Sequence, residues 1–222
     1  MIGLQEPGRQ TQETLIRQFI RSCVSDAKGA DRSTIQRIDA LLESVANMWP
    51  QGWLEVAAFR KECGLERQSV EYALRRAVEE IPFSKEAWLI RARYAQSVSD
   101  DATVIACFVS AVEIDPSNVE LLREAALHLG KYLTDHASEI PTARRGSYLA
   151  SVRAHMERVA DSLDATGLSR LAWLFLLEGD GENGRQYARL GLSKDPHNQY
   201  CRKILEKEEV PKREYKKVAR RR

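Results

Sequence analysis

Apolar residues recur at intervals of three and four along almost the whole chain, a spacing that places them on one face of a helix. In the first such segment, residues 11–26, they are Leu15, Ile16, Phe19, Ile20 and Cys23. Almost no segment shows the strict alternation of apolar and polar residues that is typical of a strand. The sequence therefore predicts an all-α protein.

Turn and capping residues divide this pattern into helices. The predicted helices cover residues 11–26, 33–49, 51–63, 66–80, 84–98, 101–114, 117–133, 147–163, 168–178, 182–193 and 197–209. We expect a flexible start at 1–10 and an N-terminal hairpin at 11–50. A long interruption is predicted at 134–146.

Part of the pattern repeats. Segments 72–82 and 107–116 both place Ala-Val four residues ahead of a proline, and the two prolines, Pro82 and Pro116, are 34 residues apart. A weaker copy occupies residues 187–196. A fixed period of about 20–50 residues indicates a solenoid, in which each unit buries its apolar face against its neighbours. The chain is therefore expected to present a binding surface.

The repeated residues resemble the tetratricopeptide repeat, whose motif runs Trp, two residues, Leu-Gly, two residues, Tyr, then Ala, three residues, Phe, and finally Pro. In the clearest unit the matching residues are Trp88, Ala92, Phe108, Ala111 and Pro116. The match is incomplete, since Arg91 replaces the motif leucine. The half-a-tetratricopeptide repeat of RNA-processing scaffolds is a weaker match, because its aromatic-plus-glutamate signature is not evident.

The resemblance covers about residues 50–196 and implies a right-handed α-solenoid of antiparallel helical hairpins, a superhelix extending over 51–209 and closed by a final capping helix. It also implies a concave partner-binding groove along the first helix of each hairpin. The groove residues assigned in this way are Glu55, Phe59, Glu86, Arg93, Glu120, Arg123 and Trp173. The alternative for each of them is a merely solvated position.

The chemistry of these positions bears on the partner. Family members that grip the C-terminal carboxylate of heat-shock chaperones use a clamp of Lys or Arg with Asn. The matching places here hold Glu55, Phe59, Glu86, Ile90, Glu120 and Glu124. That partner is therefore disfavoured, and an acidic groove with Phe59 and Trp173 as apolar anchors suits a basic or amphipathic peptide.

Charge is concentrated at the C-terminal end. The net charge is +2, but residues 211–222 hold seven basic side chains and one acidic, which leaves −4 for the remainder. The basic residues of this tail, which we place at 210–222, are Lys212, Arg213, Lys216, Lys217, Arg220, Arg221 and Arg222. The tail is a solvated end, a phosphate-binding or nuclear-import segment, or an electrostatic contact to an acidic partner. The acidic body is a poor general nucleic-acid binder.

Catalytic and metal-binding patterns are lacking in the sequence. The four cysteines stand singly, as expected for small buried residues in a reducing compartment. His128 and His136 lie eight residues apart without the further ligands that a metal requires. No nucleotide-binding, nucleophile-elbow or zinc-protease motif occurs, and neither a signal peptide nor a membrane span is evident. We expect a cytoplasmic protein that has no enzymatic activity and needs no cofactor or metal.

The sequence thus predicts a non-catalytic scaffold or adaptor that binds a peptide or partner protein through the groove. Two alternatives stay open. The chain is the sensor or regulatory repeat part of a larger enzyme or complex, or it is a nucleic-acid-associated factor that uses its basic tail.

Overall fold

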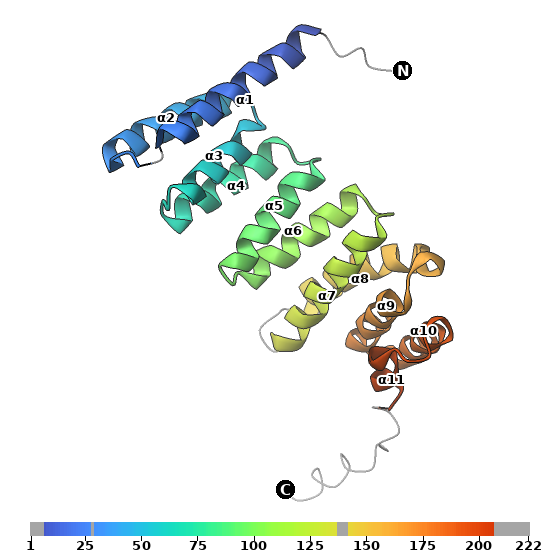
Figure 1. The fold of residues 1–222 in the computed structure, drawn as a ribbon. Helices are drawn as coiled ribbons and strands as arrows, with labels where there is room; N and C mark the ends of the chain where they lie inside the picture. The colour runs from blue at the N-terminus through green and yellow to red at the C-terminus, as the bar shows by residue number, and fades with distance from the viewer. Residues whose placement is uncertain (1–6, 28, 137–141, 207–222) are drawn as a thin grey trace, which may run out of the picture. The chain divides into compact units, whose positions relative to one another are not determined.

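The computed structural model describes residues 7–27, 29–136 and 142–206, and the basic tail lies outside these ranges. Within them the chain is helical, with one short 3-10 turn and no strand, which confirms the predicted all-α class (Figure 1). The helices are α1 (Pro7–Ala27), α2 (Arg32–Met48), α3 (Gly52–Glu62), α4 (Arg67–Glu80), α5 (Lys85–Ser97), α6 (Asp101–Ile114), α7 (Val119–Asp135), α8 (Thr142–Arg158), α9 (Ala165–Glu178), α10 (Gly181–Lys194) and α11 (Gln199–Glu206).

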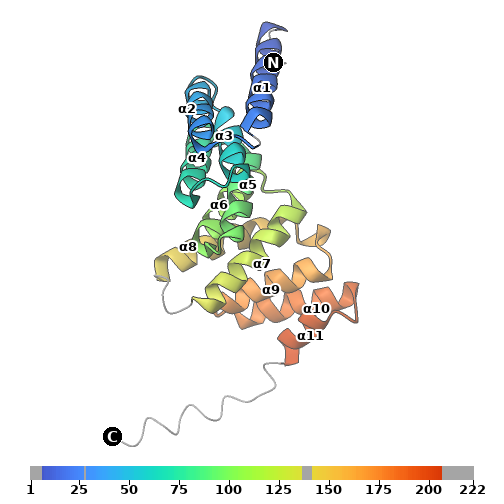
Figure 2. The ribbon, with the colours of Figure 1, turned by 60° about the vertical axis from the view of Figure 1, so that its left-hand side comes forward.

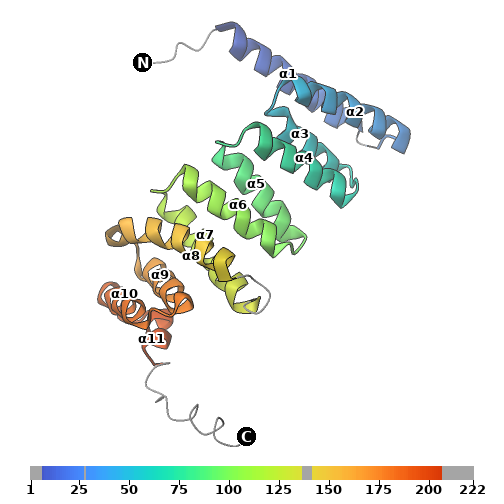
Figure 3. The ribbon, with the colours of Figure 1, turned by 180° about the vertical axis from the view of Figure 1, so that it is seen from behind.

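The chain divides into two compact units, residues 1–91 and 92–222, and the boundary falls inside α5. In the first unit α3 packs between α2 and α4. In the second, α7 and α9 lie side by side, and α10 and α11 both pack on α9 (Figure 2). From the opposite side, α8 lies against α6, α7 and α9 (Figure 3). Helices pack with their chain neighbours in pairs, as in an α-solenoid.

Polar caps explain where the helices begin. Asp31, Asp100, Asn118, Asp164 and Asp180 each stand just before a helix and accept a hydrogen bond from a backbone N–H of its first turn, at 2.7–3.1 Å. These bonds satisfy donors that have no partner within the helix. For Asp180, hydrogen bonds from the Asn183 side chain and then from the Asn183 backbone N–H lower the pKa of the carboxyl group, because they favour its charged form.

Three helices have other bounds than the sequence predicted: α1 is longer at its start, whereas α7 and α8 keep the predicted length but are shifted along the chain. The first begins at Pro7, inside the segment expected to be flexible, because a proline suits the first turn of a helix. α7 ends at Asp135 and α8 begins at Thr142, so helix occupies part of the predicted interruption at 134–146. The Thr134 hydroxyl donates to the Gly130 carbonyl at 2.7 Å, which ties it into the last turns of α7.

Two alanines of the sequence repeat are fully buried between helices. Ala77 and Ala111, which occupy the same place in the sequence repeat, are both 0% exposed. Their size lets neighbouring helices approach closely.

Replacing Ala111 by leucine should therefore destabilise the second unit, because overpacking a tight contact costs about 1–3 kcal/mol. Ala102 is exposed on the same helix, α6, and Ala102→Leu is the matched control. Urea unfolding of the two variants measures the difference. Equal midpoints would show that Ala111 does not lie at a close contact.

Candidate partner-binding site

In the first unit, one predicted anchor is not accessible. Phe59 is 0% exposed, so its assignment to the groove surface was wrong. The reason is that α3 lies between α2 and α4, and its buried residues therefore occupy two sides of the helix. Of the other positions assigned in this unit, Glu55 is half-buried and Glu86 is exposed in the first turn of α5.

The same helix carries a buried charge that the sequence interpretation missed. The Arg60 guanidinium donates to both carboxylate oxygens of Asp39 at 2.7 and 3.0 Å, to Glu43 at 2.7 Å, and to the Ser69 carbonyl at 3.0 Å. Burial lowers the pKa of Arg60, but its bonds to the two carboxylates outweigh burial and raise it. Through these bonds Arg60 joins α2, α3 and α4. Because its side chain is 4% exposed, it offers no surface to a ligand.

In the second unit, the first helices of the hairpins form one surface, which we call the first-helix face. It comprises the part of α5 from residue 92, α7 and α9. The Nε2 atoms of Gln96 on α5 and His128 on α7 are 2.8 Å apart, and Arg170 on α9 donates to the Arg123 carbonyl on α7 at 2.7 Å. The predicted groove residue Arg93 is exposed one turn before Gln96.

Trp173 contributes to this face chiefly by packing. A Cβ built on Gly130 of α7 would lie 2.6 Å from the Trp173 ring, so the indole fills the space left by the missing side chain. Trp173 is half-buried, and its role as an apolar anchor for a partner stays a prediction. Gly130 was the signal in the sequence that could have indicated this packing. A glycine inside a helix lowers helix stability by about 1 kcal/mol relative to alanine, so its presence there suggests a close contact.

Two predicted groove residues, Glu120 and Arg123, form a charged cluster on the first-helix face with two residues that the sequence interpretation overlooked, Asp164 and Arg170. Arg123 lies 3.0 Å from Glu120 and 3.5 Å from Asp164. Arg170 stands beside Arg123, and burial together with the charge of Arg123 lowers the pKa of Arg170. The face therefore carries both signs of charge and is not the acidic groove expected from its composition.

His128, on α7, is half-buried in the same face. Its ring stacks on Phe108, with centroids 4.9 Å apart and planes 12° from parallel. Burial lowers the pKa of His128 below its ordinary value. On acidification the unfolded chain therefore binds a proton at this position before the folded protein does.

We expect the stability of the second unit to fall as the pH drops below about 6.5, the ordinary histidine pKa. The sign follows because the unfolded state holds more protons between that value and the lower folded pKa of His128. Urea midpoints at pH 7.5 and 5.5 measure the loss. His128→Gln should lose less than the parent protein, and an equal loss in both would contradict the burial argument.

A second histidine cluster has the residue types of a catalytic triad in another order. Ser151 on α8 donates to Glu113 on α6, and the other oxygen of Glu113 lies 3.5 Å from His155 Nε2. The remaining ring nitrogen, His155 Nδ1, is 3.3 Å from Arg158. In nucleophilic catalysis the hydroxyl donates to the imidazole, which the carboxylate orients. This cluster instead links α6 to α8 through a central carboxylate.

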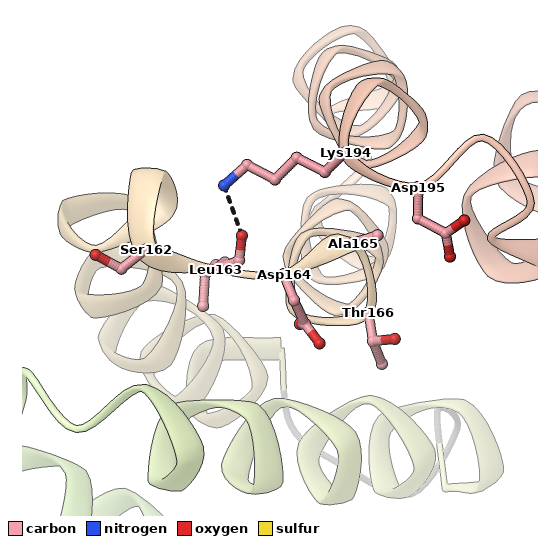
Figure 4. Close-up of a pocket in the computed structure, with 7 residues that line it drawn as sticks. All are labelled: Ser162, Leu163, Asp164, Ala165, Thr166, Lys194 and Asp195. Atoms are coloured by element: carbon pink, nitrogen blue, oxygen red, sulfur yellow. Dashed lines mark hydrogen bonds between the residues drawn. The ribbon is translucent and has the colours of Figure 1, made fainter.

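A small open depression lies where the 3-10 turn meets α9 (Figure 4). It is lined by Ser162, Leu163, Asp164, Ala165, Thr166, Lys194 and Asp195. The Lys194 ammonium donates to the carbonyls of Asp161 and Leu163 at 2.8 and 2.7 Å, and Asp164 caps α9. The Lys194 ammonium and the Asp164 carboxylate of this depression therefore already have hydrogen-bond partners within the protein.

Metal sites and membrane spans were sought in the three described ranges. In the three described ranges, no group of three or more His, Cys, Asp or Glu side chains could hold a metal ion. None of the helices in those ranges is long and apolar enough to cross a membrane. The predicted electrostatic tail, Lys212 to Arg222, lies outside the described residues.

Comparison with known proteins adds little to this geometry. No family model matches the chain, and no curated protein matches it. Among solved structures, the chain is similar to PilW, described as a widely conserved type IV pilus biogenesis factor. The match has 18% sequence identity and covers 72% of this chain and 87% of that chain, with a TM-score of 0.30. A score this low carries no argument about function.

Proposed function

We propose that this chain is a non-catalytic scaffold or adaptor, similar to tetratricopeptide-repeat proteins, that binds a peptide or partner protein through the first-helix face. The supporting observation is the contact pattern of the second unit. Gln96, Arg123, His128 and Arg170 come from three first helices, and short polar contacts bring them onto one surface. Side chains from successive repeats on one face are what an extended ligand requires.

The accessible charges of this face support a polar partner surface. Arg93, Glu120 and Glu124 are exposed on α5 and α7, and Arg123 and Arg170 are half-buried. Half-buried arginines are common in interfaces, where the planar guanidinium forms paired hydrogen bonds to a carboxylate. We include a cytoplasmic location in the proposal, because none of the four cysteines, all of which lie in the described ranges, forms a disulfide.

Affinity capture followed by mass spectrometry tests this function. The bait is the intact chain, compared with a version that ends at Val210. We expect both to capture the same protein, and removal of the tail to change mainly the salt dependence of association, since a segment of net charge +6 acts through screened attraction. Loss of all capture on removal of the tail would replace the scaffold by a tail-driven electrostatic binder.

A further inference from the structure

The first two helices expose an apolar surface. They lie at the N-terminal end of the first unit, where α2 packs on α3 and α1 packs on α2 (Figure 1). Four of their large apolar side chains are 41–80% exposed, Leu15 and Phe19 on α1 and Leu41 and Met48 on α2. The end unit of a helical repeat array normally turns a polar face to water. The hairpin at this end instead shows apolar side chains of the kind that a partner covers.

These four side chains lie on one side of the α1–α2 hairpin. At about 100° per residue, Leu41 and Met48 stand opposite the carboxylates of α2 that bind Arg60 of α3. The two helices run antiparallel, and the guanidinium carbon of Arg17 lies 5.8 Å from the centroid of the Trp49 ring, which fixes their register. In that register the two apolar side chains of α1 lie level with Met48. The four side chains therefore form one surface that points away from α3, and we call it the N-terminal face.

The rim of the N-terminal face carries balanced charge. Among the described side chains, helical spacing places Asp26 on the rim formed by α1 and Arg37 on the rim formed by α2, and both are exposed. The exposed Ser44 hydroxyl, on the same side of α2, donates to the Ala40 carbonyl at 2.9 Å. A partner can therefore cover this hydroxyl without depriving it of a hydrogen bond. A face with few charges at its centre is typical of a protein interface.

We propose that a second copy of this chain covers the N-terminal face, so that two hairpins form a symmetric four-helix bundle. A two-fold axis parallel to the helices lays α1 of each copy on α2 of the other. Every helix then has antiparallel neighbours, as in up-down-up-down bundles. In this arrangement Met48 meets Leu15 and Phe19 of the other copy. Asp26 meets Arg37 of the other copy, because the loop between α1 and α2 lies at the same end of the bundle in both copies.

The dimensions of the hairpin suit a dimer of this kind. α2 has 17 residues and extends about 25 Å, and two packed helices with their side chains span about 20 Å. The face therefore measures about 500 Å² in each copy, and about 1,000 Å² in total is near the lower limit for a specific interface. The balanced rim favours an identical face over an anionic lipid surface, because only a copy offers both Asp26 and Arg37 an opposite charge. The dimer does not use the first-helix face and is therefore independent of the proposed scaffold function.

Sedimentation equilibrium of the full chain tests the dimer. We expect a reversible equilibrium between monomer and dimer. Met48→Glu should raise the dissociation constant at least about tenfold, because it puts a charge where an apolar anchor is buried. Phe83→Glu is the matched control, since Phe83 is 88% exposed in the same unit, in the turn between α4 and α5. It should leave the dissociation constant unchanged, and equal helical circular dichroism signals show that both variants are folded.

A charge swap tests the symmetry of the arrangement. Asp26→Arg and Arg37→Asp should each weaken the homodimer, because like charges then face each other across the interface. An equal mixture of the two variants should restore association, since each contact again joins opposite charges. A chain that is monomeric at every concentration, equal effects of Met48→Glu and Phe83→Glu, or a mixture that associates no better than its components would each overturn the dimer. Binding of a monomeric chain to phosphatidylserine vesicles, abolished by Met48→Glu, would overturn it in favour of a lipid surface.

Discussion

Replacing Arg60 by methionine is expected to destabilise the first unit by about 1.5–3 kcal/mol, the usual worth of a hydrogen bond to a charged group, since the carboxylates left behind are 21% and 36% exposed. The substitution leaves Asp39 without its two hydrogen bonds and Glu43 without one, in a place where Arg60 itself is 4% exposed. Urea unfolding measures the change in the free energy of unfolding, and hydrogen exchange shows whether the loss lies in α2, α3 and α4.

Arg75→Met is the matched control for Arg60→Met. Arg75 lies on α4 of the same unit, is 55% exposed, and stands 4.0 Å from Glu79. Exposed pairs of this kind contribute about 0–1 kcal/mol. Similar losses in the two variants would mean that Arg60 is solvated and does not join the three helices.

Replacing Gly191 by valine is expected to disrupt the packing of α10 on α9 and α11. A Cβ at this position would lie 2.4 Å from the sulfur of Cys201 and 3.4 Å from the Ala165 carbonyl oxygen. The Cys201 side chain is fully buried, so its sulfur has little room to move. Burial also raises the pKa of the thiol to about 11, so the thiol stays neutral. Overpacking such a contact costs about 1–3 kcal/mol and occasionally more.

Two further variants give the Gly191 result its meaning. Gly146 lies in the exposed part of α8 with no atom within 4 Å of a built Cβ, so Gly146→Val should change the unfolding midpoint little. Adding Cys201→Ala to Gly191→Val should restore part of the lost stability, because contacting residues are coupled. If the double variant is no more stable than Gly191→Val alone, the sulfur is not the obstacle.

The hydrophobic pattern was sufficient to predict the fold class. Intervals of three and four gave helices in the right order, and α6 begins at the predicted residue 101, directly after its cap Asp100. α7 begins two residues after its predicted start at 117, because Asn118 is its cap. Gly64, which follows α3, has the left-handed backbone, with φ of +64°, that glycine commonly adopts after a helix. These features are local, so each is visible in a few consecutive residues.

The candidate site depended on which helices lie side by side, and the pattern did not contain that information. Phe59 was placed on the surface because a regular hairpin would expose its side of α3, but α2 and α4 enclose the helix. No sequence feature marked Arg60, because its partners Asp39 and Glu43 lie on another helix, one turn apart on α2. Arg170 was not singled out in the sequence, because its contact with the Arg123 carbonyl depends on the packing of α7 on α9.

The most direct test of the scaffold function is a comparison of two charge-reversal variants in the affinity capture. The first carries Arg93→Glu and Glu124→Lys, both exposed on the first-helix face. The second carries Arg189→Glu and Glu182→Lys, exposed on α10, with the same change in charge. We predict that the first variant loses the captured partner and the second retains it, with equal helical signals. Retention by the first variant and loss by the second would contradict binding through the first-helix face.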